Sequence, residues 1–185
     1  MSTIKIAVPL AEGFEEIEAV SIIDVLRRAG LEVTVVSVSG NREVNGSHNI
    51  KIIADKLFEE VNFEETDMIV LPGGLPGATN LNEHAGLRNV ILEFDKSKKA
   101  LGAICAAPLV LGGIGILQNK NATCYPGFEN QLEGATTTGK DVELTNNIVT
   151  GKGAGVAIKF ALKIVESFKG KAFADELATK MIVQY

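Results

Sequence analysis

The chain has 185 residues, of which 46% are hydrophobic and 22% charged, and its formal net charge is -5. This length suffices for a core without disulfide or metal cross-links, so we expect a single domain over residues 1–185. The acidic balance, without a Lys/Arg stripe and interleaved aromatic residues, excludes nucleic acid as the main partner. A small or neutral ligand fits this composition better.

The first third of the chain alternates strand and helix. A buried strand at residues 4–10 leads into a helix at residues 14–29, and a β-branched strand follows at residues 31–38. Such a β-α-β start, with near-continuous apolar strands, is typical of a parallel sheet covered on both faces. An Asn-Gly pair within residues 41–54 predicts a short edge hairpin.

The remainder continues the alternation, with a polar hairpin-like region at residues 136–149. Further strands are predicted at residues 68–71, 100–104, 122–125 and 147–150, and further helices at residues 87–94, 156–168 and 173–182. We therefore expect a three-layer α/β/α sandwich, flavodoxin-like, with a mostly parallel central sheet. Ligands in such folds bind beyond the carboxyl ends of the strands.

Cys105 follows the strand at residues 100–104 directly, and Pro108 opens an apolar segment of helical spacing. Pro is tolerated in the first turn of a helix, so we expect a helix that starts just after Cys105. This strand-turn-helix arrangement is typical of a nucleophile elbow, where the free N–H groups of the helix favour a thiolate. A lone free cysteine in an apolar run is also commonly an inert core residue, so the elbow alone does not decide.

One carboxylate interrupts the apolar stripe of the first predicted helix. The stripe has helical spacing at Phe14, Glu18, Ile22, Val25 and Ala29. Burial raises the pKa of a carboxyl group and is tolerated mainly where a partner or a catalytic task exists. We interpret Glu18 as a functional residue, a general acid/base or a hydrogen-bond partner of the thiol. Glu15 and Glu16 are interpreted as ordinary capping or solvated charges.

A glycine pair ends another strand at the same edge of the predicted sheet. Gly73 and Gly74 lie in P-G-G-L-P-G at residues 72–77, where backbone without side chains can approach a ligand. The N–H of Gly73 or Gly74, together with that of Ala106, predicts an oxyanion hole. The alternative is that these glycines only form a tight turn.

No metal, nucleotide or membrane is expected. The two cysteines, Cys105 and Cys124, have neither a C-x-x-C nor a zinc-ligand spacing, which favours a reducing compartment, the cytoplasm. Two glycine-rich stretches, at residues 134–141 and 151–156, each lack a residue that a nucleotide site requires. The uncharged run at residues 100–117 reaches membrane-spanning length, but glycines and a proline interrupt it.

Four motifs in this order resemble the DJ-1/ThiJ/PfpI superfamily, in its DJ-1-like branch. They are E-G-F-E-E-I-E-A-V at the first helix, V-L-P-G-G, G-A-I-C-A-A-P at the elbow and T-G-K-G-A-G near the end. The resemblance spans nearly the whole chain and implies that Glu18 is the family's buried glutamate and Cys105 its reactive cysteine. It also implies that Gly74 and Ala106 supply the oxyanion-type amides, and that the chain forms a homodimer with the first helix near the interface.

The resemblance implies cofactor-free chemistry on a small carbonyl substrate. Our leading hypothesis is a Cys/Glu enzyme acting on small α-oxoaldehydes, either a glyoxalase III-like lyase that converts methylglyoxal to lactate or a deglycase-type hydrolase. The alternative is an oxidative-stress-sensing, chaperone-like dimer whose cysteine is oxidised to sulfinate without turnover.

Several positions depart from the family pattern. Tyr125 stands where relatives in this branch often carry a histidine, and it is a poor base because the pKa of a tyrosine is about 10. His48 stands at a loop position where relatives can offer arginine, and Lys152 replaces another arginine. We take Tyr125 and His48 as candidate substrate-binding residues. Ala106 stands where the protease-like branch has histidine, so a peptidase is not expected.

Overall fold

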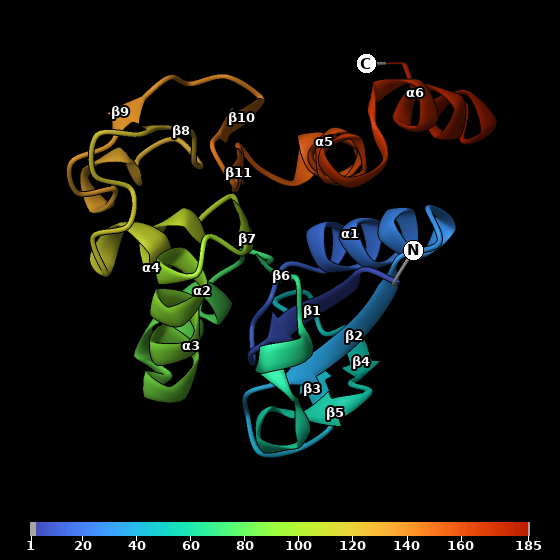
Figure 1. Ribbon diagram of the computed structural model, residues 1–185. Coiled ribbons are helices and arrows are strands. Elements are labelled where there is room, and N and C mark those ends of the chain that lie inside the picture. Colours follow the sequence, from blue (N-terminus) through green and yellow to red (C-terminus); the bar gives the residue numbers. More distant parts are fainter. Residues whose placement is uncertain (1–2, 185) are drawn as a thin grey trace.

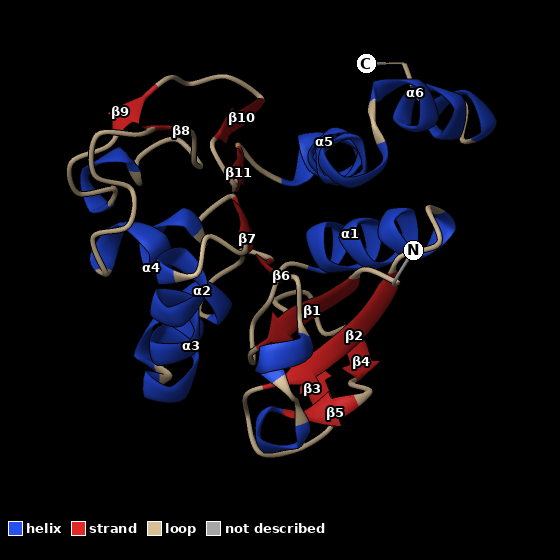
Figure 2. Cartoon of the chain, in the orientation of Figure 1, coloured by secondary structure: helices blue, strands red, loops and turns tan. Residues whose placement is uncertain are grey.

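A seven-stranded, mostly parallel sheet runs through the protein, as the computed structural model of residues 3–184 shows (Figures 1 and 2). Its order is β10-β11-β7-β6-β1-β2-β5, and only β10 and β11 pair antiparallel. The strands are β1 (Lys5–Leu10), β2 (Glu32–Ser37), β5 (Lys56–Leu57), β6 (Met68–Leu71), β7 (Ala100–Ile104), β10 (Val142–Thr145) and β11 (Ile148–Gly151). The predicted parallel sheet is confirmed.

Helices cover both faces of this sheet, which confirms the three-layer sandwich (Figure 1). On one face α1 (Glu16–Arg28) packs beside α5 (Ala157–Lys169), and α6 (Lys171–Lys180) packs against α5. The other face carries α2 (Gly77–Glu83), α3 (Ala85–Lys96) and α4 (Pro108–Gly113). Two separate hydrophobic clusters fill the two interfaces between helices and sheet.

The central strands are buried on both faces, which explains their uninterrupted apolar sequences. All four residues of β6 are buried, as are four of the five residues of β7. The register pairs Leu71 with Ala103 and Gly151 with Ile104, so β6, β7 and β11 end at one common edge. The loops that follow these strands are therefore brought together at that edge.

The predicted hairpin forms, but it is not an edge of the main sheet. β3 (Glu43–Asn45) and β4 (Lys51–Ile53) make a two-stranded sheet of their own, in which Asn45 pairs with Lys51. The Asn-Gly pair is therefore not a two-residue turn, because residues 46–50 separate the strands. Ser47 N donates to Phe14 O at 2.8 Å, so this longer turn wraps around the start of α1.

Three local predictions need correction. The strand predicted at residues 122–125 is only β8 (Asn121–Ala122), which pairs with β9 (Thr136–Thr137). Helix α2 was not predicted, because its sequence has too few apolar residues for a helical period. The helix after the elbow begins at Pro108 rather than just after Cys105, since residues 105–107 form a turn.

Short 3-10 turns complete the description, at η1 (Phe58–Glu60), η2 (Phe63–Glu65), η3 (Glu129–Gln131) and η4 (Ala154–Val156). Within residues 3–184, no helix has both the length and the apolar character needed to cross a membrane.

Candidate active site

Cys105 occupies a strained turn directly after β7. Its backbone has φ +63°, a left-handed conformation that is uncommon for a residue with a side chain. Two hydrogen bonds hold it there: Cys105 N donates to Gly151 O at 2.9 Å, and Tyr125 N donates to Cys105 O at 2.8 Å. The side chain is half-buried. The elbow predicted from the sequence is therefore present, with the thiol raised at the carboxyl edge of the sheet.

Glu18 reaches this thiol from the first turns of α1, as the apolar stripe predicted. The residue has no exposed surface, and its Oε2 accepts a hydrogen bond from Gly73 N at 2.7 Å. The Cys105 side chain hydrogen-bonds to the same carboxyl group. Glu15 positions the turn, because its side chain accepts from Glu18 N at 2.7 Å and its N–H donates to Gly73 O at 2.9 Å. Its predicted capping role is confirmed.

Gly73 is the spacer between the two reactive side chains. A Cβ atom added at Gly73 would lie 2.7 Å from Cys105 Cβ and 2.9 Å from Glu18 Oε2. Only a glycine leaves Glu18 and Cys105 this close together. Since the Gly73 N–H is committed to Glu18, it positions the carboxyl group rather than an oxyanion.

The Glu18 carboxyl group and the Cys105 thiol form a pair that can hold one proton between them. Burial raises the pKa of Glu18 to about 7, against the hydrogen bonds from Gly73 and Cys105, which lower it. Burial, together with the negative charge of Glu18, raises the pKa of Cys105 to about 12. Protonating Glu18 removes that repulsion and thereby favours the thiolate. The backbone N–H groups at the elbow favour the thiolate, as expected from the sequence, but burial and the charge of Glu18 outweigh them.

Two backbone amides favour the anionic form of the sulfur. The N–H groups of Ala106 and Gly74 hydrogen-bond to Cys105 and lower the pKa of its thiol. Gly74 has φ +89°, and a Cβ there would lie 2.7 Å from Gly13 O, so the chain turns sharply against the loop before α1. Donors arranged around a sulfur in this way can also stabilise an oxygen that becomes negatively charged beside it.

Tyr125 lines a cavity of about 340 Å³ next to the elbow. Pro126 and residues 152–156 form the rest of its wall, which includes Lys152. The Tyr125 ring is half exposed, and a Cβ on Gly153 would lie 3.3 Å from it. The cavity thus adjoins the two segments whose backbones hydrogen-bond to Cys105.

His48 lies in the hairpin turn and contacts Glu16 instead of the thiol. Its Nδ1 is 2.8 Å from Glu16 Oε2, and its N–H donates to Glu16 Oε1 at 2.6 Å. Its side chain is 71% exposed, whereas that of Glu16 is 5% exposed. The prediction that Glu16 is a solvated charge is wrong, because the turn at residues 46–50 covers its carboxylate. Burial raises the pKa of Glu16, but hydrogen bonds from His48 and Ile50 outweigh it and lower the value to about 2.

Among residues 3–184, one group combines side chains of metal-ligating type: Glu15, Glu16 and His48, whose ligand atoms lie within 4.8 Å of one another. Glu15 caps α1 and Glu16 binds the hairpin turn, so both carboxylates already have structural partners. The positive end of a helix dipole also disfavours a cation at this position. The absence of a metal stays an expectation from the sequence.

Cys124 is not part of the pair. It is buried, and burial raises the pKa of its thiol to about 11, with a further contribution from the charge of Glu129. A protonated and buried thiol is a poor nucleophile. Cys105 differs from Cys124 in being only half-buried and in lying beside the carboxyl group of Glu18.

The sequence model of one family matches residues 4–167, and it is described as the DJ-1/PfpI family. The chain belongs to the DJ-1/PfpI family. A solved structure of oxidized DJ-1 from Toxoplasma gondii superimposes with a TM-score of 0.95 at 41% identity, covering 99% of this chain and 100% of that one. The crystal structure of DJ-1beta from Drosophila melanogaster superimposes with a TM-score of 0.93 at 35% identity, and the match covers 100% of both chains.

Curated relatives place the chain in the DJ-1-like part of this family. It is 40% identical over 185 residues to DJ-1 homolog B of Arabidopsis thaliana, covering 99% of this chain but 42% of that protein's length. For the glutathione-independent glyoxalase DJR-1.2 of Caenorhabditis elegans, identity is 35% over 167 residues, with 90% of this chain and 89% of that protein covered. The chain thus spans under half of the Arabidopsis relative and most of the nematode one.

Proposed function

We propose that this DJ-1/PfpI protein is a cofactor-independent enzyme that converts small α-oxoaldehydes such as methylglyoxal to hydroxy acids. The observation that carries the proposal is the buried Glu18, whose pKa is raised to about 7 and whose carboxyl group hydrogen-bonds to Cys105. General acid/base catalysis is most effective when the pKa of the group lies near the working pH. The naming of a relative at 35% identity as a glutathione-independent glyoxalase supports the same chemistry.

In the first step, the Cys105 sulfur adds to the aldehyde carbon, and the carbonyl oxygen takes the proton held by Glu18. The amides of Gly74 and Ala106 stabilise the negative charge that develops on this oxygen. Glu18, now ionised, removes the hydrogen from the former aldehyde carbon and returns it to the neighbouring ketone carbon. The hydroxyl proton moves from the first oxygen to the second, which leaves a hydroxyacyl thioester on Cys105.

Water then attacks the thioester and releases the hydroxy acid and the free thiol. The sum is one aldehyde and one water giving one hydroxy acid, so the oxidation of one carbon is balanced by the reduction of its neighbour. No external oxidant, reductant or metal enters this balance. Tyr125 and Lys152 border the cavity beside Cys105 and are suited to contact the substituent of the ketone carbon.

The test is the production of D- and L-lactate from methylglyoxal by the parent protein, Cys105→Ser and Glu18→Gln, in the presence of a chelator. We expect many turnovers per protein for the parent and none for either variant. Cys124→Ser and Glu59→Gln are matched controls at a buried thiol outside the pair and at an exposed carboxylate. If the parent only consumes one aldehyde per thiol, Cys105 is reactive without a working proton relay, and the proposal fails.

A second candidate is a redox sensor in which Cys105 is oxidised to sulfinate. It is favoured by the protonated carboxyl group that Glu18 can offer to a sulfinate oxygen, and by Tyr125, which stands where relatives often carry a histidine. Attack of the thiolate on one peroxide gives sulfenate and water, and a second peroxide gives sulfinate. Mass spectrometry after peroxide treatment tests this candidate. Oxidation of Cys105 that stops at two added oxygen atoms in the parent, and does not stop there in Glu18→Leu, supports sensing. Addition of a third oxygen atom in the parent contradicts it.

We also propose that the chain forms a homodimer through α1 and the β3–β4 hairpin. Four large apolar side chains are exposed there: Ile17 at 60%, Val20 at 50%, Ile50 at 57% and Ile53 at 65%. Contiguous exposed apolar surface is typical of protein interfaces, and the hairpin turn contacts the start of α1, where Ser47 N donates to Phe14 O. Light scattering after gel filtration tests this: Val20→Glu with Ile53→Glu should give monomers, and a monomeric parent refutes it.

Two free cysteines suit a reducing location such as the cytoplasm.

A further inference from the structure

A cavity of about 440 Å³ lies at the opposite edge of the sheet from Cys105. It is bounded by η2, the second half of α3 and the loop that enters β7. Lys99 precedes β7 and Cys105 follows it, so the two are separated by the length of the strand, roughly 20 Å. The volume falls within the range of small-molecule sites, about 300–1,000 Å³. The proposed chemistry at Cys105 makes no use of this cavity.

The floor of this cavity is apolar and aromatic. Phe63 and Phe94 contribute rings and Val90 a branched side chain, and the lining is mainly apolar. Phe94 is buried, while Phe63 and Val90 are half-buried. A flat apolar body can therefore replace water against these side chains.

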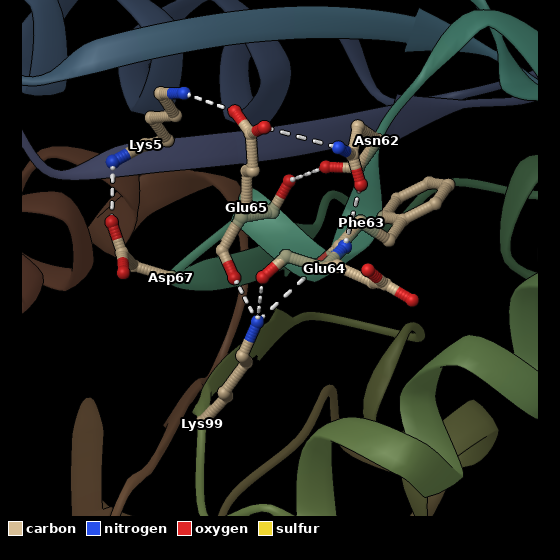
Figure 3. A network of polar contacts seen from close by, with 8 residues as sticks. Lys5, Asn62, Phe63, Glu64, Glu65, Asp67 and Lys99 are labelled. Carbon is tan, nitrogen blue, oxygen red and sulfur yellow. Dashed lines mark hydrogen bonds and ion pairs between the residues drawn. The ribbon is translucent and has the colours of Figure 1, made fainter.

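Lys99 fixes the wall that carries Phe63 (Figure 3). Its ammonium group donates to the carbonyl oxygens of Phe63, Glu64 and Thr66, at 3.3, 2.7 and 2.9 Å. It also lies 5.0 Å from the centre of the Phe94 ring. Glu65 holds the same turn from the other side through Lys5 Nζ at 2.7 Å and Asn62 Nδ2 at 3.2 Å. The cavity wall is thus preorganised.

The same contacts decide which charge a ligand can carry. An ammonium group has three N–H donors, and Lys99 uses three on backbone carbonyls, so it has none left for an anion. The rim carries two carboxylates, Glu64 and Glu93, both exposed. The Glu64 carboxylate takes no part in the network of Figure 3. Within residues 3–184, the Glu93 carboxylate has one ion pair, with Lys96 at 3.7 Å between exposed groups, and such a pair is weak in water.

We propose that this cavity binds small cationic amphiphiles, in which an aromatic or flat apolar body rests on Phe63, Val90 and Phe94 and a protonated amine faces Glu64 and Glu93. Asn89 and Ser97 complete the rim and offer neutral hydrogen-bonding groups. Preorganisation by Lys99 lowers the conformational cost of binding. The inference is independent of the chemistry at Cys105.

The test uses phenethylamine, phenethyl alcohol and phenylacetate, which share one aromatic body and differ in charge. Amide chemical shifts of the full chain are followed by two-dimensional NMR at neutral pH and low salt. We expect shifts confined to residues 63–66 and 89–99. Phenethylamine should bind about fivefold more tightly than phenethyl alcohol, and phenylacetate more weakly than either. Added salt should reduce the preference for the amine.

Two sets of variants separate charge from shape. Glu64→Gln with Glu93→Gln should bring the amine to the affinity of the alcohol, whereas Glu59→Gln, outside the cavity, should leave the preference intact. Asn89→Trp fills the cavity from an exposed helix position and should abolish binding of both the amine and the alcohol. Leu92→Trp, at another exposed position of the same helix, is the control and should leave both bound.

Four results overturn the proposal. Equal affinity for amine and alcohol in the parent shows an unselective apolar cavity. Tightest binding of phenylacetate shows that Lys99 is available to anions. No binding of any probe, or shifts mainly outside the named segments, shows that the cavity is not a site for this class of ligand.

Discussion

Replacing Glu18 by Gln should make Cys105 more acidic while abolishing turnover. Gln keeps the shape of Glu18 and an oxygen that can accept the Gly73 N–H, but it carries no charge and cannot take up a proton. Of the causes that raise the pKa of Cys105 to about 12, burial then remains and the charge of Glu18 is removed. An ionised neighbour shifts a pKa by about 1–3 units, so we expect a fall of that size.

The assay is the rate of alkylation of Cys105 by iodoacetamide as a function of pH, in a Cys124→Ser background that leaves one thiol in the chain. At pH 8 the variant should react about 10- to 1,000-fold faster than its parent, because each pKa unit changes the thiolate fraction about tenfold. The gain should shrink below about pH 7, where Glu18 of the parent is itself protonated.

Two outcomes refute this reasoning. An unchanged pH profile shows that the charge of Glu18 does not act on the sulfur. Slower alkylation of the variant over the whole range shows that Glu18 stabilises the thiolate, the opposite of the repulsion described above. Glu59→Gln in the same background controls for a general loss of negative charge.

Three further predictions concern stability, each measured by urea unfolding. Lys99→Met should lower the free energy of unfolding by about 1–3 kcal/mol, because three carbonyl oxygens lose a charged donor; Lys96→Met, on an exposed side chain, is the control, and equal losses contradict it. Gly73→Ala should lower the free energy of unfolding by about 1–3 kcal/mol, because the added methyl group overcrowds Glu18 and Cys105, and it should change the pH profile of Cys105 alkylation. A variant as stable as the parent would show that Glu18 and Cys105 can move apart. Glu16 and Glu18 should have opposite effects on the pH dependence of stability. The pKa of Glu16 is lowered to about 2 on folding, so the stabilisation by its carboxylate is present above about pH 4.5 and is lost towards pH 2. The pKa of Glu18 is raised to about 7, so the parent loses stability as the pH rises from about 4.5 through 7. The difference in the free energy of unfolding between Glu16→Gln and the parent should therefore shrink towards pH 2. For Glu18→Gln the difference should increasingly favour the variant as the pH rises from about 4.5 to 7 and should stay constant above that range; pH-independent differences contradict both.

Local patterns predicted the sheet and the pair well. Strands buried on both faces must be apolar throughout, so β1, β6 and β7 are visible in the sequence as unbroken runs. Glu18 was identifiable because its place in a helical stripe determines which face it occupies. Both signals depend only on residues within one element.

Contacts between distant segments could not be predicted in this way. Glu16 is buried by a turn some thirty positions later, and the only trace in the sequence is Gly46, where a side chain would collide with the Glu16 carboxylate. The roles of Gly73 and Gly74 depend on which way each N–H points, which residue types do not specify. The raised pKa of Cys105 could not be predicted from the sequence, because it depends on how deeply the thiol is buried and how close Glu18 lies. Burial and the charge of Glu18 outweigh the two amides at the elbow.

The two hydrogen bonds that hold Cys105 at a positive φ come from segments that are synthesised after it. Residue 125 supplies one donor and residue 151 the acceptor for the other. A ribosome that has released only the first half of this chain therefore exposes an ordinary flexible cysteine, with neither the elbow nor the enclosed carboxyl partner in place. The raised pKa values of Glu18 and Cys105 belong to the finished protein. A fall in the reactivity of this thiol can therefore report, during translation or refolding, when the last strands of the sheet have joined it.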